Sequence, residues 1–138
     1  MTDYSRFEYL QVEVSDRVAV VTLNRPDILN AINPPMHREL DDIFVDFSLD
    51  NEVNAIVLTG AGRGFCAGGD ISGMGQRIAE EPPRRSSIGT GSRLINNMLE
   101  VGQPIIAAVN GDPWDWAPPL RCSVTWCLRR RTPGGPAT

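Results

Sequence analysis

Alternating hydrophobic and polar positions near the start of the chain predict a pair of β-strands. Val12 and Val14 alternate with polar residues, a Ser-Asp turn follows, and residues 18–23 are rich in β-branched side chains. A period of two is typical of strands that bury one face. Pro26 ends the second strand, so we expect the pair to lie within residues 9–26.

The hydrophobic period changes after Pro34-Pro35, and the new spacing predicts an amphipathic helix of about four turns. A proline suits the first turn of a helix, because the N–H that it lacks would have no partner there. The side chains that we expect on the buried face are Met36, Leu40, Ile43, Phe44 and Phe47.

Two short apolar runs, residues 54–60 and 104–111, predict buried strands, and a second amphipathic segment over residues 88–101 separates them. We expect the first of these strands to be buried on both faces, as strands of parallel sheets are. The order strand-strand-helix-strand-helix-strand is typical of an α/β fold with parallel crossover connections. We therefore assign the chain to the α/β class.

Composition limits the classes of function. The chain has 138 residues, enough for one domain, and its net charge of −4 does not favour nucleic acid. No run reaches the ~18 apolar residues of a membrane span, and residues 1–10 lack the features of a secretory signal. The cysteines form no Cys-x-x-Cys pair and, with the single histidine, no metal-binding spacing. These features predict a cytoplasmic protein without disulfides, bound metal or membrane partner.

The composition changes abruptly after Asp112. Residues 113–138 are rich in proline, tryptophan and arginine, show no helical or strand period, and contain Asp115 as their one acid. The tryptophans argue against a disordered tail, and the prolines argue against a basic-aromatic arm for nucleic acid. We expect residues 1–112 to form the folded part and residues 113–138 to be foreign to it.

The genetic code offers a third interpretation of this change, a lost reading frame. Residues 113–118 must be encoded CCN TGG GAY TGG GCN CCN. Reading from the third base of each codon gives Gly-Leu-Gly at the fixed positions, after a codon that allows Met and before one that allows Ala. These hidden residues look like the continuation of a buried α/β motif, whereas the visible residues do not. We therefore interpret residues 113–138 as out of frame.

Residues 61–71 form a glycine-rich loop after the third predicted strand, and two chemistries fit such a loop. Gly62-x-Gly64-x-x-Ala67 meets the loose fingerprint of the NAD(P)-binding short-chain dehydrogenases. In that fold the loop follows the first strand, and a helix begins at once so that its N-terminus meets the pyrophosphate. Here two strands and a helix come first, and Gly68-Gly69-Asp70 follows. Dinucleotide binding is therefore the weaker interpretation.

The stronger interpretation rests on several separate motifs. Leu23-Asn24-Arg25-Pro26 and Leu29-Asn30-Ala31 resemble the first coenzyme A loop of the crotonase superfamily, the enoyl-CoA hydratases and isomerases. Ile56–Gly60 followed by Gly64–Ile71 is similar to the oxyanion-loop signature of that superfamily. Ile106–Gly111 resembles the strand before its second oxyanion donor, and the hidden Gly-Leu-Gly falls where the family continues.

The resemblance implies a crotonase-like fold, a spiral of ββα units of which this chain would hold the N-terminal part. It also implies an acyl-CoA substrate, whose thioester carbonyl takes on enolate character that two backbone N–H groups stabilise. The amide of Gly69 would be the first donor. No cofactor is implied, because coenzyme A is part of the substrate. The residues that the resemblance places along the coenzyme A thioester are Asp27, Leu29, Ala31, Ala67, Asp70 and Ile71.

The sequence departs from the family where the second donor is expected. That donor would come from the middle of Gly-Leu-Gly, and Trp114–Trp116 stand in its place. The two glutamates that the hydratases use are absent as well, so hydration and isomerisation stay open. Family members form homotrimers or hexamers, an assembly that this chain is not expected to complete. We therefore expect a truncated chain that is inactive or nearly so.

Other hypotheses remain for the same residues. The chain could be a non-catalytic fragment, either unstable or pairing with full-length subunits, or a coenzyme A-binding module. Asp70 could cap a turn as well as lie beside the substrate. Cys66 is interpreted as a small packed residue and not a nucleophile, because no histidine neighbours it in the sequence.

Overall fold

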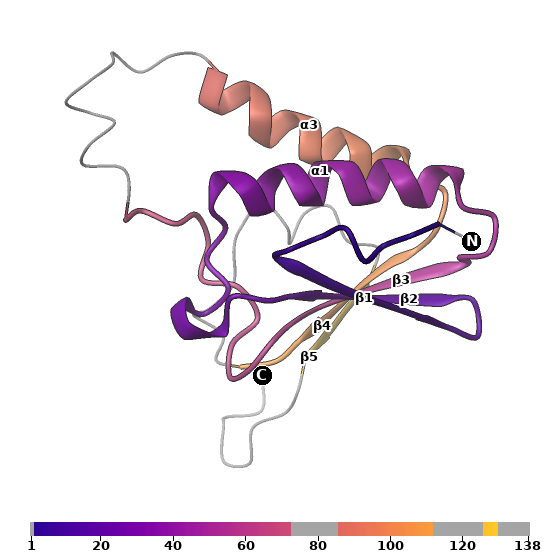
Figure 1. The fold of residues 1–138 in the computed structure, drawn as a ribbon, viewed down its shortest axis with the longest axis horizontal. Coiled ribbons are helices and arrows are strands. Elements are labelled where there is room, and N and C mark those ends of the chain that lie inside the picture. Colours follow the sequence, from indigo (N-terminus) through magenta and orange to yellow (C-terminus); the bar gives the residue numbers. More distant parts are fainter. Residues whose placement is uncertain (1, 73–85, 112–125, 130–138) are drawn as a thin grey trace.

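Two helices lie on one side of a β-sheet in the computed structural model (Figure 1). The structure describes residues 2–72, 86–111 and 126–129. The elements are β1 (Leu10–Ser15), β2 (Val18–Leu23), a short 3-10 helix η1 (Pro26–Ile28), α1 (Pro34–Leu49), β3 (Ala55–Gly60), α3 (Ser86–Glu100), β4 (Ile105–Val109) and β5 (Trp126–Arg129).

The sheet has five strands in the order β1-β2-β3-β4-β5. β1 and β2 are antiparallel, and the residues that join them, Asp16 and Arg17, both have positive φ, at 50° and 66°. Two such residues match the twist of a tight hairpin. The remaining neighbours are parallel, and α1 and α3 provide the crossovers from β2 to β3 and from β3 to β4. The predicted α/β class and the order of elements up to β4 are confirmed.

A strand is present after residue 112, although the sequence shows no strand period there. Residues 126–129 form β5, which pairs with β4 in parallel from Ile106 opposite Trp126 to Val109 opposite Arg129. The neighbouring prolines and arginines hid a stretch of aromatic and aliphatic residues that suits an extended chain. The expected boundary between residues 112 and 113 lies outside the described residues.

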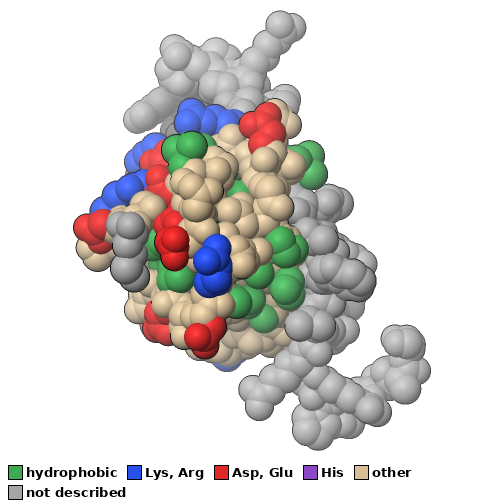
Figure 2. Space-filling view, turned by 90° about the vertical axis from the view of Figure 1, so that its right-hand side faces the viewer, with side chains coloured by type: hydrophobic (Ala, Val, Ile, Leu, Met, Phe, Trp, Pro, Cys, Tyr) green, Lys and Arg blue, Asp and Glu red, His purple; other side chains and the backbone are tan. Residues whose placement is uncertain are grey.

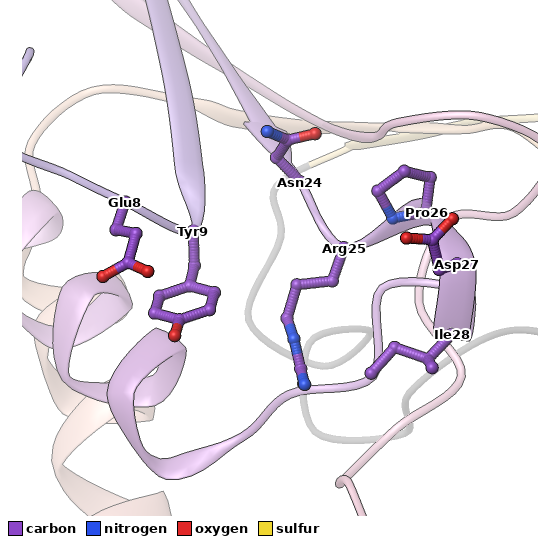
Figure 3. A pocket seen from close by; sticks show the side chains of 7 residues that line it. All are labelled: Glu8, Tyr9, Asn24, Arg25, Pro26, Asp27 and Ile28. Carbon is purple, nitrogen blue, oxygen red and sulfur yellow. The ribbon is translucent and has the colours of Figure 1, made fainter.

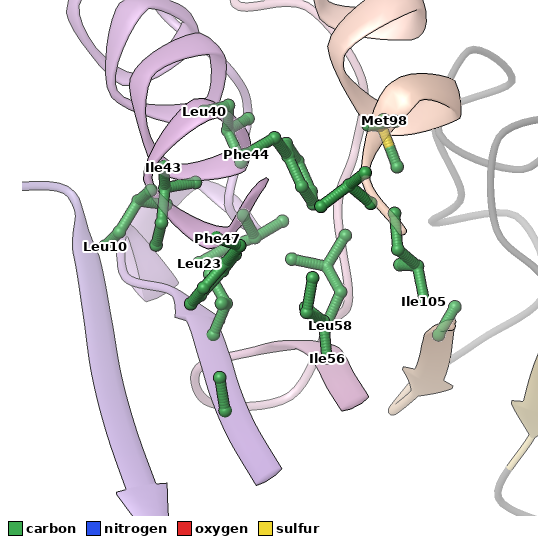
Figure 4. Close-up of a cluster of buried hydrophobic side chains, with 14 of the residues drawn as sticks. Leu10, Leu23, Leu40, Ile43, Phe44, Phe47, Ile56, Leu58, Met98 and Ile105 are labelled. Carbon is green, nitrogen blue, oxygen red and sulfur yellow. The ribbon is translucent and has the colours of Figure 1, made fainter. Parts of the chain in front are cut away.

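The amphipathic helix is confirmed, with the buried face that its spacing predicts. Its N-cap is Asn33, whose side chain accepts a hydrogen bond from the Met36 N–H at 2.9 Å. Phe44 and Phe47 contact each other edge to face and pack above Leu58 of β3 (Figure 4). The side chains of α1 that face the sheet are all fully buried: Met36, Leu40, Ile43, Phe44 and Phe47.

The strand β3 is fully buried on one face only, contrary to the prediction. Ile56 and Leu58 are fully buried, whereas Ala55, Val57 and Thr59 are half-buried. The difference arises because α1 and α3 both cover the same face of the sheet (Figure 1). The half-buried residues therefore belong to the second face of the sheet, away from the helices.

The surface carries hydrophobic side chains among charged ones. Acidic, basic and hydrophobic groups are interspersed on the face that Figure 2 shows. Leu49 at the end of α1 is 77 % exposed and Leu99 of α3 is 66 % exposed. Within the described ranges, neither helix has the length and apolar character needed to cross a membrane.

Candidate functional site

Two loops meet at one edge of the sheet. The first loop, residues 24–32, follows β2, and the second loop, residues 61–72, follows β3. Because β2 and β3 are parallel, their carboxyl ends reach the same edge, where open α/β sheets place their ligands. The sequence motifs assigned to coenzyme A and to the oxyanion thus lie next to each other in space.

Main-chain hydrogen bonds join the two loops. The Ile32 N–H donates to the Gly68 carbonyl at 2.7 Å, and the Asp70 N–H donates to the Ile32 carbonyl at 2.9 Å. These bonds form a parallel β-bridge between Ile32 and Gly69. A third bond runs from the Ala67 N–H to the Leu29 carbonyl at 2.9 Å. The second loop therefore extends along the first like a short additional strand.

The bridge sets the direction of the Gly69 N–H. This N–H and the Gly68 carbonyl belong to one planar trans peptide group, so they point in opposite directions. Since the carbonyl binds Ile32, the Gly69 N–H points away from the first loop. Gly69 is exposed, and its N–H makes no hydrogen bond to the part of the chain that the structure describes. It is a fixed donor that a ligand can reach.

Asn30 supports both loops from the inside. It is fully buried, with φ of 55°. Its amide group donates to the Ala61 carbonyl at 2.9 Å and to the Gly64 carbonyl at 2.8 Å, and its Oδ1 accepts from the Arg25 N–H at 2.8 Å. One side chain thus satisfies three main-chain groups that the loops would otherwise leave without partners.

A second asparagine holds the start of the second loop. Asn110, just after β4, accepts from the Gly60 N–H at 3.1 Å and donates to the carbonyls of Gly60 and Gly62 at 2.7 and 3.1 Å. The chain packs so tightly here that a Cβ on Gly60 would lie 2.3 Å from the Phe65 carbonyl oxygen. These contacts make the base of the loop rigid.

An ion pair between two part-buried side chains connects the two loops. The Arg25 guanidinium donates from the same nitrogen to Asp70 Oδ2 at 3.0 Å and to the Ala31 carbonyl at 2.6 Å. Asp70 Oδ1 accepts from the side chain and the N–H of Ser72. The Ser72 hydrogen bonds, and after them Arg25, lower the pKa of Asp70 to about 2. Asp70 is therefore ionised at neutral pH, and it caps the turn at Ser72 as one of our hypotheses predicted.

A surface pocket of about 430 Å³ lies beside the first loop (Figure 3). The Arg25 side chain extends between Tyr9 and Ile28 there, and its guanidinium carbon is 5.8 Å from the centre of the Tyr9 ring. Among the predicted substrate residues, Asp27 lines this pocket. The lining residues are Glu8, Tyr9, Asn24, Arg25, Pro26, Asp27 and Ile28.

The other predicted site residues lie along the two joined loops. Leu29 and Ala31 are half-buried in the first loop, where their carbonyls bind Ala67 and Arg25. Ala67 is exposed, and Ile71 is 74 % exposed at the end of the second loop. The structure thus brings the predicted residues of the first loop next to those of the second loop.

Two roles were missed in the sequence. Arg25 and Asn30 stand in the quoted motifs without a function of their own, yet they make most of the side-chain contacts between the loops. The preference of asparagine for positive φ was a local signal for Asn30. Arg25 offered no such signal, because its partner Asp70 is 45 positions away.

Cys66 is packed in the core, as predicted. Its side chain is fully buried, and burial raises the pKa of its thiol. A buried, protonated thiol is a poor nucleophile. No group of three histidine, cysteine or acidic side chains lies close enough to hold a metal ion within residues 2–72, 86–111 and 126–129.

The second loop does not have the geometry of a dinucleotide-binding loop. After Ala67 the chain pairs with Ile32 in the β-bridge, and no helix begins within residues 67–72. The carbonyls of Gly62 and Gly64 bind Asn110 and Asn30. The helix N-terminus that a pyrophosphate needs is therefore missing from this position, and the NAD(P) interpretation is not supported.

Comparisons with known proteins agree on one family. The family model described as enoyl-CoA hydratase/isomerase matches residues 13–114. The short-chain-enoyl-CoA hydratase of Clostridium acetobutylicum is 40% identical over 101 residues, which cover 72% of this chain and 38% of that protein. The 1,2-epoxyphenylacetyl-CoA isomerase of Escherichia coli is 33% identical over 75% of this chain and 40% of its own length.

Solved structures show the same likeness. An enoyl-CoA hydratase/isomerase from Mycobacterium paratuberculosis superimposes with a TM-score of 0.69 at 34% identity, over 78% of this chain and 43% of that structure. One from Marinobacter aquaeolei gives a TM-score of 0.75 at 29% identity, over 88% and 48%. The chain spans less than half the length of these relatives, and it matches their N-terminal portion. The chain therefore belongs to the enoyl-CoA hydratase/isomerase family and has the crotonase fold of that portion.

Proposed function

We propose that this chain binds an acyl-CoA thioester where the two loops meet, with the Gly69 N–H directed at the thioester carbonyl oxygen. The observation that carries the proposal is the direction of this N–H, which the bond between Ile32 and Gly68 fixes away from the first loop. A preorganised backbone donor stabilises negative charge that develops on a carbonyl oxygen. The printed names of the relatives, which include hydratases and isomerases of CoA thioesters, support the same substrate class.

In this proposal the coenzyme A part of the substrate lies along both loops. The pocket beside Arg25 and Asp27 offers room next to the first loop. Ala67 and Ile71 are exposed on the second loop, where an apolar chain can contact them. We assign to the thioester path Asp27, Leu29, Ala31, Ala67, Asp70 and Ile71, with Gly69 as the oxyanion donor.

We further propose that the chain does not complete the reaction by itself. An enolate needs a second donor, which the family takes from the glycine motif after Gly111, and this chain has Trp114–Trp116 there. The residues that follow Trp114–Trp116 in this sequence include no glutamate that could act as the acid–base group of a hydratase. Assembly into the homotrimer or hexamer of the family is not expected.

Proline at position 69 tests the role of the N–H directly. Gly69→Pro removes the donor and should lower the affinity for crotonyl-CoA relative to free coenzyme A by about tenfold, the value of one hydrogen bond to a partly charged oxygen. Gly69→Ala is the matched control, since a Cβ there has no atom within 4 Å and the N–H is kept. Titration calorimetry with both ligands measures the ratio.

The outcome is informative in either direction. If Gly69→Pro and Gly69→Ala both keep the ratio of the unaltered chain, the donor is elsewhere and the proposal is wrong. The same samples are assayed for crotonyl-CoA hydration, which we expect to be undetectable. Measurable hydration by the unaltered chain would contradict the proposed inactivity.

A lost reading frame is our proposal for residues 113–138, and DNA sequencing tests it. We expect the coding DNA after the codon of Gly111 to read on through Gly-Leu-Gly once a single base is restored. The codons of residues 113–118 allow this at every position. A confirmed sequence without an open shifted frame downstream would instead show that the visible residues, β5 included, are the natural continuation.

A further inference from the structure

Arg25 touches both loops at once. Its side chain starts just after β2 and extends along the pocket (Figure 3). One guanidinium nitrogen binds both the Ala31 carbonyl and the Asp70 carboxylate. The pair is largely shielded, since the side chains of Arg25 and Asp70 are 20% and 14% exposed. Hydrogen bonds between charged groups in such surroundings are strong and directional.

The two partners of Arg25 flank the bridge that directs the Gly69 N–H. Ala31 precedes Ile32, which binds the Gly68 carbonyl, and Asp70 follows Gly69. Gly68 and Gly69 form a flexible pair, and Gly68 has φ of +99°, so the peptide between them is free to rotate unless its neighbours are held. The Arg25 contacts hold both sides of that peptide.

We infer that Arg25 is a positioning residue, which keeps Ile32 and Asp70 in register and thereby aims the Gly69 N–H at the thioester carbonyl. The inference rests on the proposed function for its ligand, although the contacts themselves do not depend on it. Arg25 touches no reacting atom in this role. Its effect is on the direction of a neighbouring main-chain donor.

The chain supplies a matched control for this ion pair. Arg6 and Asp46 also form an arginine–aspartate pair, between the N-terminal segment and α1. The Arg6 side chain is 49% exposed, and the pair does not involve either loop. Arg6→Gln therefore removes the same type of interaction at a place where the Gly69 peptide should not respond.

Amide hydrogen exchange of the full chain, followed by NMR, tests the positioning. In Arg25→Gln and in Asp70→Asn we expect the exchange of the Ile32 and Asp70 N–H groups to rise about tenfold, because each loses a neighbouring anchor. Exchange of the core strand residues Val21 and Leu58 should stay unchanged, which separates a local effect from a loss of global stability. The exchange of these two N–H groups in Arg25→Lys should lie between that of these variants and that of the unaltered chain. In Arg6→Gln it should equal that of the unaltered chain.

The ligand provides an independent readout. Crotonyl-CoA bound to the unaltered chain should show its thioester carbonyl stretch shifted to lower frequency. Arg25→Gln should reverse most of this shift, whereas Arg6→Gln should keep it. If Arg25→Gln leaves both the exchange and the carbonyl stretch unchanged, the positioning role is overturned. If the carbonyl stretch does not shift on binding to the unaltered chain, the proposed function fails. The exchange of the Ile32 and Asp70 N–H groups alone then supports or overturns the positioning role of Arg25.

Discussion

Asn30→Ala should lower the free energy of unfolding by about 3 kcal/mol, a large fraction of the stability of a small domain. The carboxamide satisfies the Ala61 carbonyl, the Gly64 carbonyl and the Arg25 N–H, and the contact with Gly64 is fully buried. Removing it leaves the buried contact to Gly64 and the part-buried contacts to Ala61 and Arg25 unmade. Chemical denaturation followed by circular dichroism measures the loss.

Two further variants separate the causes. Asn30 has φ of 55°, which alanine tolerates poorly and glycine accepts, so Asn30→Gly isolates the lost hydrogen bonds from about 1 kcal/mol of backbone strain. Asn54→Ala is the exposed control, because its side chain accepts only from Arg17 among the residues described. We expect a change within about 0.5 kcal/mol there. An Asn30→Gly variant as stable as the unaltered chain would contradict the supporting role of Asn30.

Gly60→Ala should be destabilising by a similar amount, about 3 kcal/mol, for a steric reason. The added Cβ would lie 2.3 Å from the Phe65 carbonyl oxygen, 2.4 Å from that of Gly64 and 2.8 Å from the Asn30 amide nitrogen. Two of these atoms belong to the main chain, so relief requires the second loop to move away from β3. We therefore expect Gly60→Ala to weaken acyl-CoA binding as well as stability.

Gly102 provides the control for this substitution. A Cβ at Gly102 meets no atom within 4 Å, and this residue does not have positive φ. Gly102→Ala should leave the unfolding midpoint unchanged or raise it slightly through the entropy of the unfolded chain. Equal unfolding midpoints for Gly60→Ala and Gly102→Ala, by heat and by denaturant, would contradict the prediction. They would show that the second loop accommodates the added Cβ without loss of stability.

The sequence predicted the parts of the fold that depend on local periodicity. The five buried hydrophobic residues of α1 follow from their helical spacing, because a helix against a sheet needs one continuous apolar face. The prediction that β3 is buried on both faces was wrong, since periodicity does not say on which side the helices pack. β5 was missed because prolines and arginines dominate the composition around it.

In the site, too, local patterns could be predicted and long-range contacts could not. The motifs around Gly69 could be recognised in the sequence as a pattern of small residues, and the structure places them next to the first loop. The interactions that hold this arrangement could not be recognised. Arg25 binds Asp70 across 45 positions, and Asn30 binds Gly64 across 34, and no local pattern links such partners. Only the parallel pairing of β2 and β3 brings them together.

The joined loops have a consequence for how the chain is made. Among the described residues, the contacts that direct the Gly69 N–H come from residues up to 72, and the longest of them spans 45 positions. A ribosome therefore delivers all the parts of this donor before it has translated α3, β4 or anything that follows. The partners of the bridge between Ile32 and Gly69 are thus present before Asn110, which braces the base of the second loop, has been added. The nascent chain thus contains the Gly69 donor and the residues that direct it while the rest of its domain is still unmade.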